Sequence, residues 1–167
     1  RAIRNGSDND IYVMIGGTRT FFYKYSISGN SWTSLTATPG NIDNGSAMIR
    51  NATDNDIYVL QGNGTGFYKY SISGNSWTGS ATSNLTSVPA SVNYGGQMLR
   101  NASDNDIYVL QGNSATGFYK YSISGNSWTT LAVVPGAVYL GGTMLRNGAD
   151  NDIYVLRGDN NTSFYKY

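Results

Sequence analysis

The sequence of 167 residues contains no cysteine and no histidine. Without cysteine, the chain has neither a disulfide framework nor a thiolate metal site. Without histidine, it also lacks the commonest general base and the commonest side-chain ligand of transition metals. These two absences argue against a metalloenzyme and against most forms of nucleophilic catalysis.

Charged residues are also scarce: they make up 13 % of the chain, where roughly 25 % is usual. The 11 basic and 10 acidic residues give a net charge of +1, which leaves no basic stripe for binding nucleic acid. No apolar run approaches the roughly 18 residues that a membrane span needs, and no signal peptide is recognisable at Arg1. We interpret the chain as a processed product or an excerpt. Its polar surface of Ser, Thr, Asn, Gly and Tyr is typical of extracellular or cell-surface proteins.

What the sequence does contain is a strong internal repeat. The segment Asp-Asn-Asp-Ile-Tyr-Val occurs four times, at spacings of 46 or 50 residues, beginning at Asp8, Asp54, Asp104 and Asp150. Phe-Tyr-Lys-Tyr follows in every copy, and Ser-Ile-Ser-Gly-Asn-Ser-Trp-Thr follows in the first three, with its indole at Trp32, Trp77 and Trp128. We divide residues 1–167 into the repeats 1–38, 39–88, 89–134 and 135–167, of which the last is incomplete.

Each repeat is predicted to form four short β-strands. In the second repeat these are 46–50, 57–61, 67–72 and the stretch around Trp77, all rich in β-branched and aromatic residues and bounded by Asn, Asp and Gly. Both alternating faces of the strands are apolar, which requires a sheet that is covered on each side. We therefore predict an all-β fold: a β-propeller with four-stranded antiparallel blades. About four blades lie in this chain, as part of a larger propeller or assembly, and aromatic residues fill the space between blades.

The repeats resemble kelch repeats, in which an Ile-Tyr-Val strand leads to a Gly pair, a Tyr and then Asn-x-Trp. The matching segments of the first copy are Ile11-Tyr12-Val13, Gly16-Gly17, Tyr25 and Asn30-Ser31-Trp32. Later copies keep only one Gly of the pair, and Ser26, Ser71 and Ser122 stand where kelch repeats often have Asp. The resemblance implies a ring of six or seven blades. The chain is then an excerpt of a longer array, half of a two-chain ring, or a small four-bladed ring.

The copies differ from one another mainly on one side of the predicted blades. The turns between strands one and two and between strands three and four are nearly constant, whereas the other loops and the connections between repeats vary. Binding commonly resides in loops on a rigid scaffold, although drift at unconstrained loops is the alternative explanation. We predict that this variable face binds the ligand, through Arg19, Asp43, Tyr94, Tyr139, Arg157 and Asp159.

The Asp-Asn-Asp turns place oxygen side chains close together, as Ca²⁺ requires. They lack the Gly and the distal Glu of an EF-hand loop, and a plain Asx turn accounts for them. We therefore expect no cofactor and no metal site, with Ca²⁺ at these turns as the weaker alternative. Lysines and arginines that recur on the strands are expected to pair with the Asp turns, at Lys24, Lys69, Lys120, Lys166, Arg50, Arg100 and Arg146.

Acceptor sequences for N-glycosylation, Asn-x-Ser/Thr, exceed what chance would give, although repetition inflates their number. They occur at Asn5, Asn44, Asn51, Asn63, Asn84, Asn101, Asn160 and Asn161.

Three functions are compatible with these features. The favoured one is a noncatalytic extracellular or cell-surface module that binds a protein or glycan, or that assembles with further copies of the repeat in the same parent chain or in a homo-oligomer. The second is a structural building block of a filament, sheath or surface layer. The third is a carbohydrate-active enzyme domain using Asp43 and Asp159 as acid and base, but no carboxylate pair here has a recognisable catalytic signature.

Overall fold

The computed structural model describes residues 1–79 and 85–167, and these residues contain β-strands and no helix. Short runs of aromatic and β-branched residues form the strands, and Asn- and Gly-rich turns separate them. The strands are β1 (Ala2–Arg4), β2 (Ile11–Met14), β3 (Phe22–Ser26), β4 (Ser31–Ser34), β5 (Ala47–Arg50), β6 (Ile57–Leu60), β7 (Phe67–Ser71), β8 (Ser76–Gly79), β9 (Gln97–Arg100), β10 (Ile107–Leu110), β11 (Phe118–Ser122), β12 (Ser127–Thr130), β13 (Thr143–Arg146), β14 (Ile153–Gly158) and β15 (Asn161–Lys166).

The strands form four antiparallel sheets, each built from strands that follow one another in the chain. Three sheets have four strands, β1 to β4, β5 to β8 and β9 to β12, and the last has the three strands β13 to β15. Each sheet lies within one sequence repeat. The predicted all-β architecture of four-stranded antiparallel blades is therefore confirmed, and the predicted strands agree with the observed ones to within a residue at each end.

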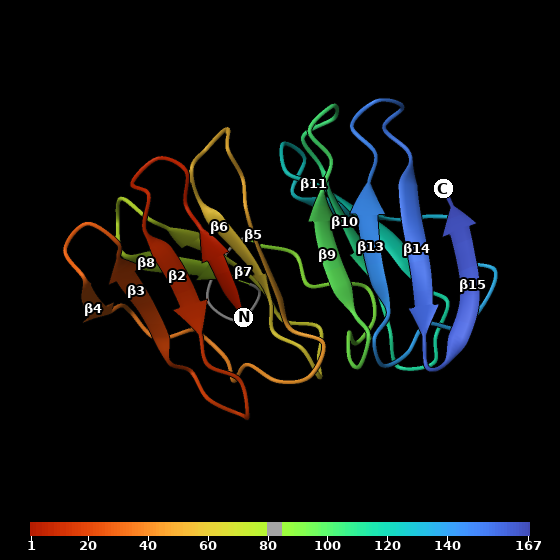
Figure 1. The fold of residues 1–167 in the computed structure, drawn as a ribbon, viewed down its shortest axis with the longest axis horizontal. Helices are drawn as coiled ribbons and strands as arrows, with labels where there is room; N and C mark the ends of the chain where they lie inside the picture. Colours follow the sequence, from red (N-terminus) through yellow and green to blue (C-terminus); the bar gives the residue numbers. More distant parts are fainter. Residues whose placement is uncertain (80–84) are drawn as a thin grey trace.

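The first strands of the four sheets, β1, β5, β9 and β13, lie next to one another in that order. The sheets therefore stack face to face, with their first strands toward the inside and their later strands toward the outside, as in the blades of a propeller. Figure 1 shows the sequence of sheets from the first, drawn in red and orange, to the last, drawn in blue. None of the residues that the structure describes belongs to a helix able to cross a membrane.

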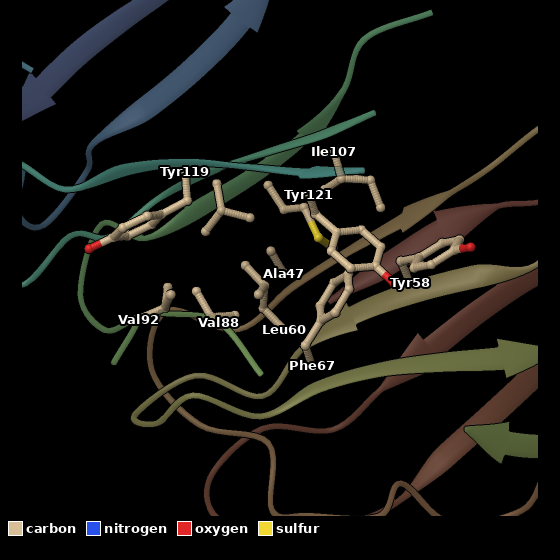
Figure 2. Packing of buried hydrophobic residues seen from close by; sticks show 11 residues of the cluster. Ala47, Tyr58, Leu60, Phe67, Val88, Val92, Ile107, Tyr119 and Tyr121 are labelled. Atoms are coloured by element: carbon tan, nitrogen blue, oxygen red, sulfur yellow. The ribbon is translucent and has the colours of Figure 1, made fainter. Parts of the chain in front are cut away.

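Aromatic residues fill the space between neighbouring sheets, and they do so in the same way at the first two junctions. Phe22 of β3 packs edge-on against Tyr70 of β7 and Trp77 of β8, with ring centroids 4.9 and 5.1 Å away. One sheet further on, Phe67 packs against Tyr121 and Trp128 at 4.8 and 5.1 Å. Figure 2 shows Phe67 and Tyr121 meeting in this second interface. Because these contacts join residues about one repeat apart, the core lies between the repeats and not within any one of them.

The middle sheets bury both of their faces, as the sequence pattern requires. All four residues of β6 and all four of β10 are buried, whereas in β2 only alternate residues are. The first and last sheets thus have one covered face and one open face. This difference between sheets of nearly the same sequence comes only from their place in the stack.

Candidate functional site

The variable face is built from the connections between sheets and the loops between their second and third strands. Each connection contains a buried aliphatic residue, which we call the anchor, that forms a β-bridge to the loop of the preceding sheet. The three bridges are Arg19 to Ile42, Gly64 to Val92 and Ala115 to Val138. Because the same bridge recurs, the loops and connections of this face share one backbone framework despite their different side chains.

The two positions after each anchor carry the variation. The first of them always donates its backbone N–H to a carbonyl oxygen at the end of the second strand of the next sheet: Asp43 to Gln61, Asn93 to Gln111 and Tyr139 to Arg157, at 3.0 to 3.1 Å. The second always accepts from a loop N–H: Asn44 from Asn63, Tyr94 from Asn113 and Leu140 from Asp159, at 2.7 to 2.9 Å. Different side chains are therefore displayed from equivalent, hydrogen-bonded backbone positions.

Three of the displayed side chains meet to form a continuous surface, which we call the aromatic ridge: Asn44, Tyr94 and Tyr139. The rings of Tyr94 and Tyr139 lie 5.9 Å apart and are tilted by 59° to each other. The side-chain amide of Asn44 donates a hydrogen bond of 3.1 Å to the Tyr94 hydroxyl. The ridge thus joins connections that lead into the second, third and fourth sheets, and it combines aromatic faces with amide and hydroxyl groups.

A polar hollow of about 210 Å³ lies beside the ridge, between the first and second sheets. The Asp43 carboxylate lines it and accepts a hydrogen bond of 2.8 Å from the Asn44 backbone. A pair of side-chain amides borders it, because Asn93 donates to the Asn63 side-chain oxygen at 2.9 Å. The remaining lining residues are Thr18, Asn41, Gln61 and Gly62.

The structure brings Asp43, Tyr94 and Tyr139 into this region, whereas the other three predicted binding residues lie elsewhere on the face. Arg19 is exposed, and its guanidinium lies over the Phe21 ring at 5.9 Å. Arg157 is half-buried, and its Nε donates to the Ala137 carbonyl at 2.8 Å, which ties it to the scaffold. Asp159 is exposed in the loop of the last sheet.

Sequence reasoning did not single out Asn44 and Asn93 as members of the binding surface. An alignment of the three connections on their anchors contains the missing signal. It places Asp43, Asn93 and Tyr139 at one position and Asn44, Tyr94 and Leu140 at the next. Both positions then stand out as variable between an anchor that is always aliphatic and a glycine that is constant.

The opposite face carries the Asp-Asn-Asp turns, whose carboxylates are occupied by local partners. Asp54 accepts the backbone N–H of Asp56 at 3.0 Å and the Tyr58 hydroxyl at 3.0 Å. Lys69 forms ion pairs with Asp56 at 3.0 Å and with Asp54 at 3.3 Å. The expected pairing of the strand lysines with the Asp turns is therefore observed.

The arginines also pair with the Asp-Asn-Asp turns, as expected, but through a different residue of the turn. Arg50 donates its Nε to the Asn55 side-chain oxygen at 2.9 Å, and Arg100 does the same to Asn105. Their partner is thus the middle Asn of each turn and not an aspartate. The reason is local geometry: Asn55 has a φ of 61°, and in this conformation its amide oxygen meets the arginine of the paired strand.

Residues 1–79 and 85–167 contain no group of three or more Asp, Glu, His or Cys side chains arranged to hold a metal ion. The turn carboxylates already accept hydrogen bonds and ion pairs, so Ca²⁺ would have to displace a lysine. The absence of a cofactor and the weaker Ca²⁺ alternative both remain predictions.

The Asp54 turn makes stability depend on pH. Burial alone would raise the pKa of Asp54, but the Asp56 N–H, the Tyr58 hydroxyl and Lys69 outweigh it and hold the pKa below its ordinary value of 3.8. A carboxyl with a lowered folded-state pKa stabilises the fold above its unfolded pKa and loses that contribution as pH falls through the folded value. We expect the free energy of unfolding, measured by urea titration, to decrease as the pH is lowered below about 4. In Asp54→Asn this decrease with pH should be less steep. Thr53→Ala, in the same turn, should keep the wild-type slope, and equal slopes for all three proteins would contradict the assignment.

Some of the predicted glycosylation acceptors are buried and others are exposed. Asn5, Asn51 and Asn101 are buried, so a glycan has no room there in the folded chain, and burial argues against these sites. Asn84 lies outside the described residues. The proposal of glycosylation is kept for the exposed acceptors, Asn44, Asn63, Asn160 and Asn161. A glycan at Asn44 would stand on the aromatic ridge itself.

Comparison with known proteins adds information on the fold. No protein-family model matches the sequence, and no curated protein matches it. Among solved structures, the chain is similar to an auxiliary nutrient binding protein from Bacteroides thetaiotaomicron (TM-score 0.64, 13 % identity, 93 % of this chain and 42 % of that one). It is also similar to YjhT (TM-score 0.69, 16 % identity, 92 % and 56 %) and to an auxiliary nutrient binding protein from Bacteroides ovatus (TM-score 0.63, 13 % identity, 93 % and 42 %).

These similarities support the fold alone. The chain spans about half the length of the solved structures that it matches. The kelch assignment rests on the repeat motifs, with no family model behind it, and stays a prediction.

Proposed function

We propose that this chain is a noncatalytic repeat module of a kelch-like β-propeller, extracellular or at the cell surface, that binds glycans through its variable face. The observation that carries the proposal is the aromatic ridge, in which the Tyr94 and Tyr139 rings meet and Asn44 hydrogen-bonds to Tyr94. Variable side chains on a repeated backbone framework are the usual construction of a binding surface on a rigid scaffold.

The chemistry of the ridge suits a sugar. A tyrosine ring offers a flat apolar face for the C–H face of a pyranose, and it brings a hydroxyl that can hydrogen-bond at its edge. Amide side chains such as Asn44 and Asn93 both donate and accept, as a sugar hydroxyl does. The Asp43 carboxylate in the adjoining hollow adds a strong acceptor for sugar hydroxyl groups.

A noncatalytic role agrees with how the carboxylates are placed. Asp43 lies in the connection between the first and second sheets, whereas Asp159 lies in the loop of the last sheet. Glycosidases that use two carboxylates hold them roughly 5 to 10 Å apart across one bond. The names of the two similar Bacteroides structures, which describe binding proteins, point the same way.

The proposal predicts that the tyrosines of the ridge dominate binding. On an array of neutral and acidic oligosaccharides, we expect the wild-type chain to retain a defined subset, measured afterwards by calorimetry. Tyr94→Ala and Tyr139→Ala should each weaken that binding by about tenfold or more, because truncating a central aromatic contact typically costs 1 kcal/mol or more, often about 2. Neither variant should change the melting temperature by more than a few degrees, since Tyr94 is exposed and Tyr139 only half-buried.

Ile27→Ala is the matched control, since Ile27 is an exposed apolar residue in the turn between β3 and β4, on the constant face. It should bind as the wild type does. A chain that retains no oligosaccharide, or tyrosine variants that bind as tightly as Ile27→Ala, would refute the glycan proposal. Retention of a protein in place of any glycan would assign the face to protein binding.

The alternative of a structural building block is favoured by a different observation, the open faces at both ends of the stack of sheets.

A further inference from the structure

The last sheet exposes apolar side chains that every earlier sheet buries. Leu156 of β14 is 40 % exposed and Phe164 of β15 is 56 % exposed. The residues at the same repeat positions in the preceding sheets are buried almost completely: Met14, Leu60, Leu110, Phe22, Phe67 and Phe118. Together with Leu145 and Tyr154 on the same side of the sheet, Leu156 and Phe164 form what we call the knob face.

The first sheet has an open face of the opposite kind, on the side away from the second sheet. Its Trp32 is 61 % exposed, and with Val13, Ile15 and Tyr23 it lines a hollow of about 310 Å³. Tyr25 lies beside Trp32, with ring centroids 5.0 Å apart. We call the surface of Val13, Tyr23, Tyr25 and Trp32 the socket face.

Inside the chain, each knob face is packed on a socket face. At the first two junctions, the phenylalanine of one sheet packs its ring against both a tyrosine and a tryptophan of the next, which are themselves cross-strand partners in contact with each other. Phe22 packs against Tyr70 and Trp77, and Phe67 packs against Tyr121 and Trp128, at centroid distances between 4.8 and 5.1 Å. Phe118 meets Tyr167 of the last sheet at 4.9 Å. The phenylalanine–tyrosine part of the contact is thus made at all three junctions between sheets, and the phenylalanine–tryptophan part at the first two.

The two ends of the stack carry the matching halves of this contact. Within the described residues, Phe164 is a knob with no socket over it, and the Tyr25–Trp32 pair is a socket with no knob in it. We propose that a second copy of this chain docks head to tail on the first, placing its Phe164 in the Tyr25–Trp32 socket. A second copy fits better than an unrelated partner because one chain supplies both surfaces, and their complementarity is already realised at its own junctions.

The contact between copies is expected to be weaker than the internal junctions. Inside the chain, the Trp77 indole donates to the Thr36 carbonyl at 2.8 Å, and the Thr36 hydroxyl donates to the Asn75 carbonyl at 2.7 Å. Thr86, Trp128 and Asn126 repeat this clamp at the next junction. The knob face has no counterpart of Thr36 among its described residues, so a docked Trp32 gains the ring contacts without that hydrogen bond.

The proposed interface joins two different surfaces, so it is heterologous, and such contacts produce closed rings or open filaments. This property gives a specific test with two variants, Trp32→Ser and Phe164→Ser. The first loses its socket and keeps its knob, and the second loses its knob and keeps its socket. Analytical ultracentrifugation over a range of concentrations should show the wild type associating. Each variant alone should associate at least about thirtyfold more weakly, as expected for a central aromatic contact.

The decisive sample is an equimolar mixture of the two variants. It contains one intact knob and one intact socket, so it should form a 1:1 dimer that grows no further. Leu140→Ser removes a similarly exposed apolar residue from the variable face and should associate as the wild type does. Circular dichroism and melting of every variant check that the chain is folded.

A wild type that stays monomeric up to millimolar concentration would overturn the proposal. So would a single variant that still associates like the wild type, or a mixture that stays monomeric. The outcome is independent of glycan binding, because Tyr94 and Tyr139 belong to neither end face.

Discussion

Phe67→Ala should lower the free energy of unfolding by about 3 to 5 kcal/mol, the range seen when a buried aromatic residue is truncated. Phe67 is fully buried, and its ring fills the space between the second and third sheets, against Tyr121 and Trp128. Its loss leaves a cavity at a junction, and two residues of the next sheet lose their main contact. Urea unfolding followed by tryptophan fluorescence measures the change, and the slope of the transition shows whether the two halves still unfold together.

The repeat supplies a matched control for this prediction. Phe164 lies in the same Phe-Tyr-Lys-Tyr segment but is 56 % exposed. Phe164→Ala should therefore cost less than about 1 kcal/mol when measured at a concentration where the chain is monomeric. Equal costs at the two positions would mean that the sheets do not stack as described.

Gly62→Ala is expected to have an effect of similar size for a different reason. Gly62 has a φ of +76°, and a Cβ there would lie 2.5 Å from the backbone oxygens of Asp43 and Asn44. The backbone strain costs about 1 to 2 kcal/mol, and the collision with main-chain atoms adds about 1 to 3 kcal/mol. We expect a total loss of about 3 kcal/mol, measured by the same unfolding titration, together with a shift of the connection that carries Asn44.

Gly17 separates the two causes. Its φ is +78°, close to that of Gly62, but a Cβ there meets no atom within 4 Å. Gly17→Ala should therefore show the cost of strain alone, about 1 to 2 kcal/mol. If both alanine variants lose the same stability, the close approach of the Asp43–Asn44 backbone to Gly62 is wrong.

Local features were predictable because their causes are local. The strands predicted at 57–61 and 67–72 are observed as β6 (Ile57–Leu60) and β7 (Phe67–Ser71), since apolar runs between Asn and Gly turns favour strands in any context. The prediction that each sheet is covered on both faces followed from the same apolar runs. The Asp54 side chain accepts the backbone N–H of Asp56, two residues further along the chain. Such a local contact can be predicted from the residue types and their spacing.

The candidate site was predictable only in part. Variation between copies pointed to Asp43, Tyr94 and Tyr139, which do lie on the shared face. This variation did not indicate that Arg157 donates a hydrogen bond to the Ala137 carbonyl, nor that Asn44 donates one to the Tyr94 hydroxyl. Both interactions join residues 20 or 50 positions apart. Both interactions depend on the path that each connection takes along the edge of the next sheet.

The sequence by itself determined the four repeats, their antiparallel strands and the aromatic residues that fill the space between them. The tertiary structure alone decided which phenylalanine meets which tyrosine and tryptophan, and which of these nearly identical residues stay exposed. The physical reason is that burial in a stack is set by a neighbour. Phe67 and Phe164 begin the same Phe-Tyr-Lys-Tyr segment, and the presence of a following sheet separates the core residue from the surface one.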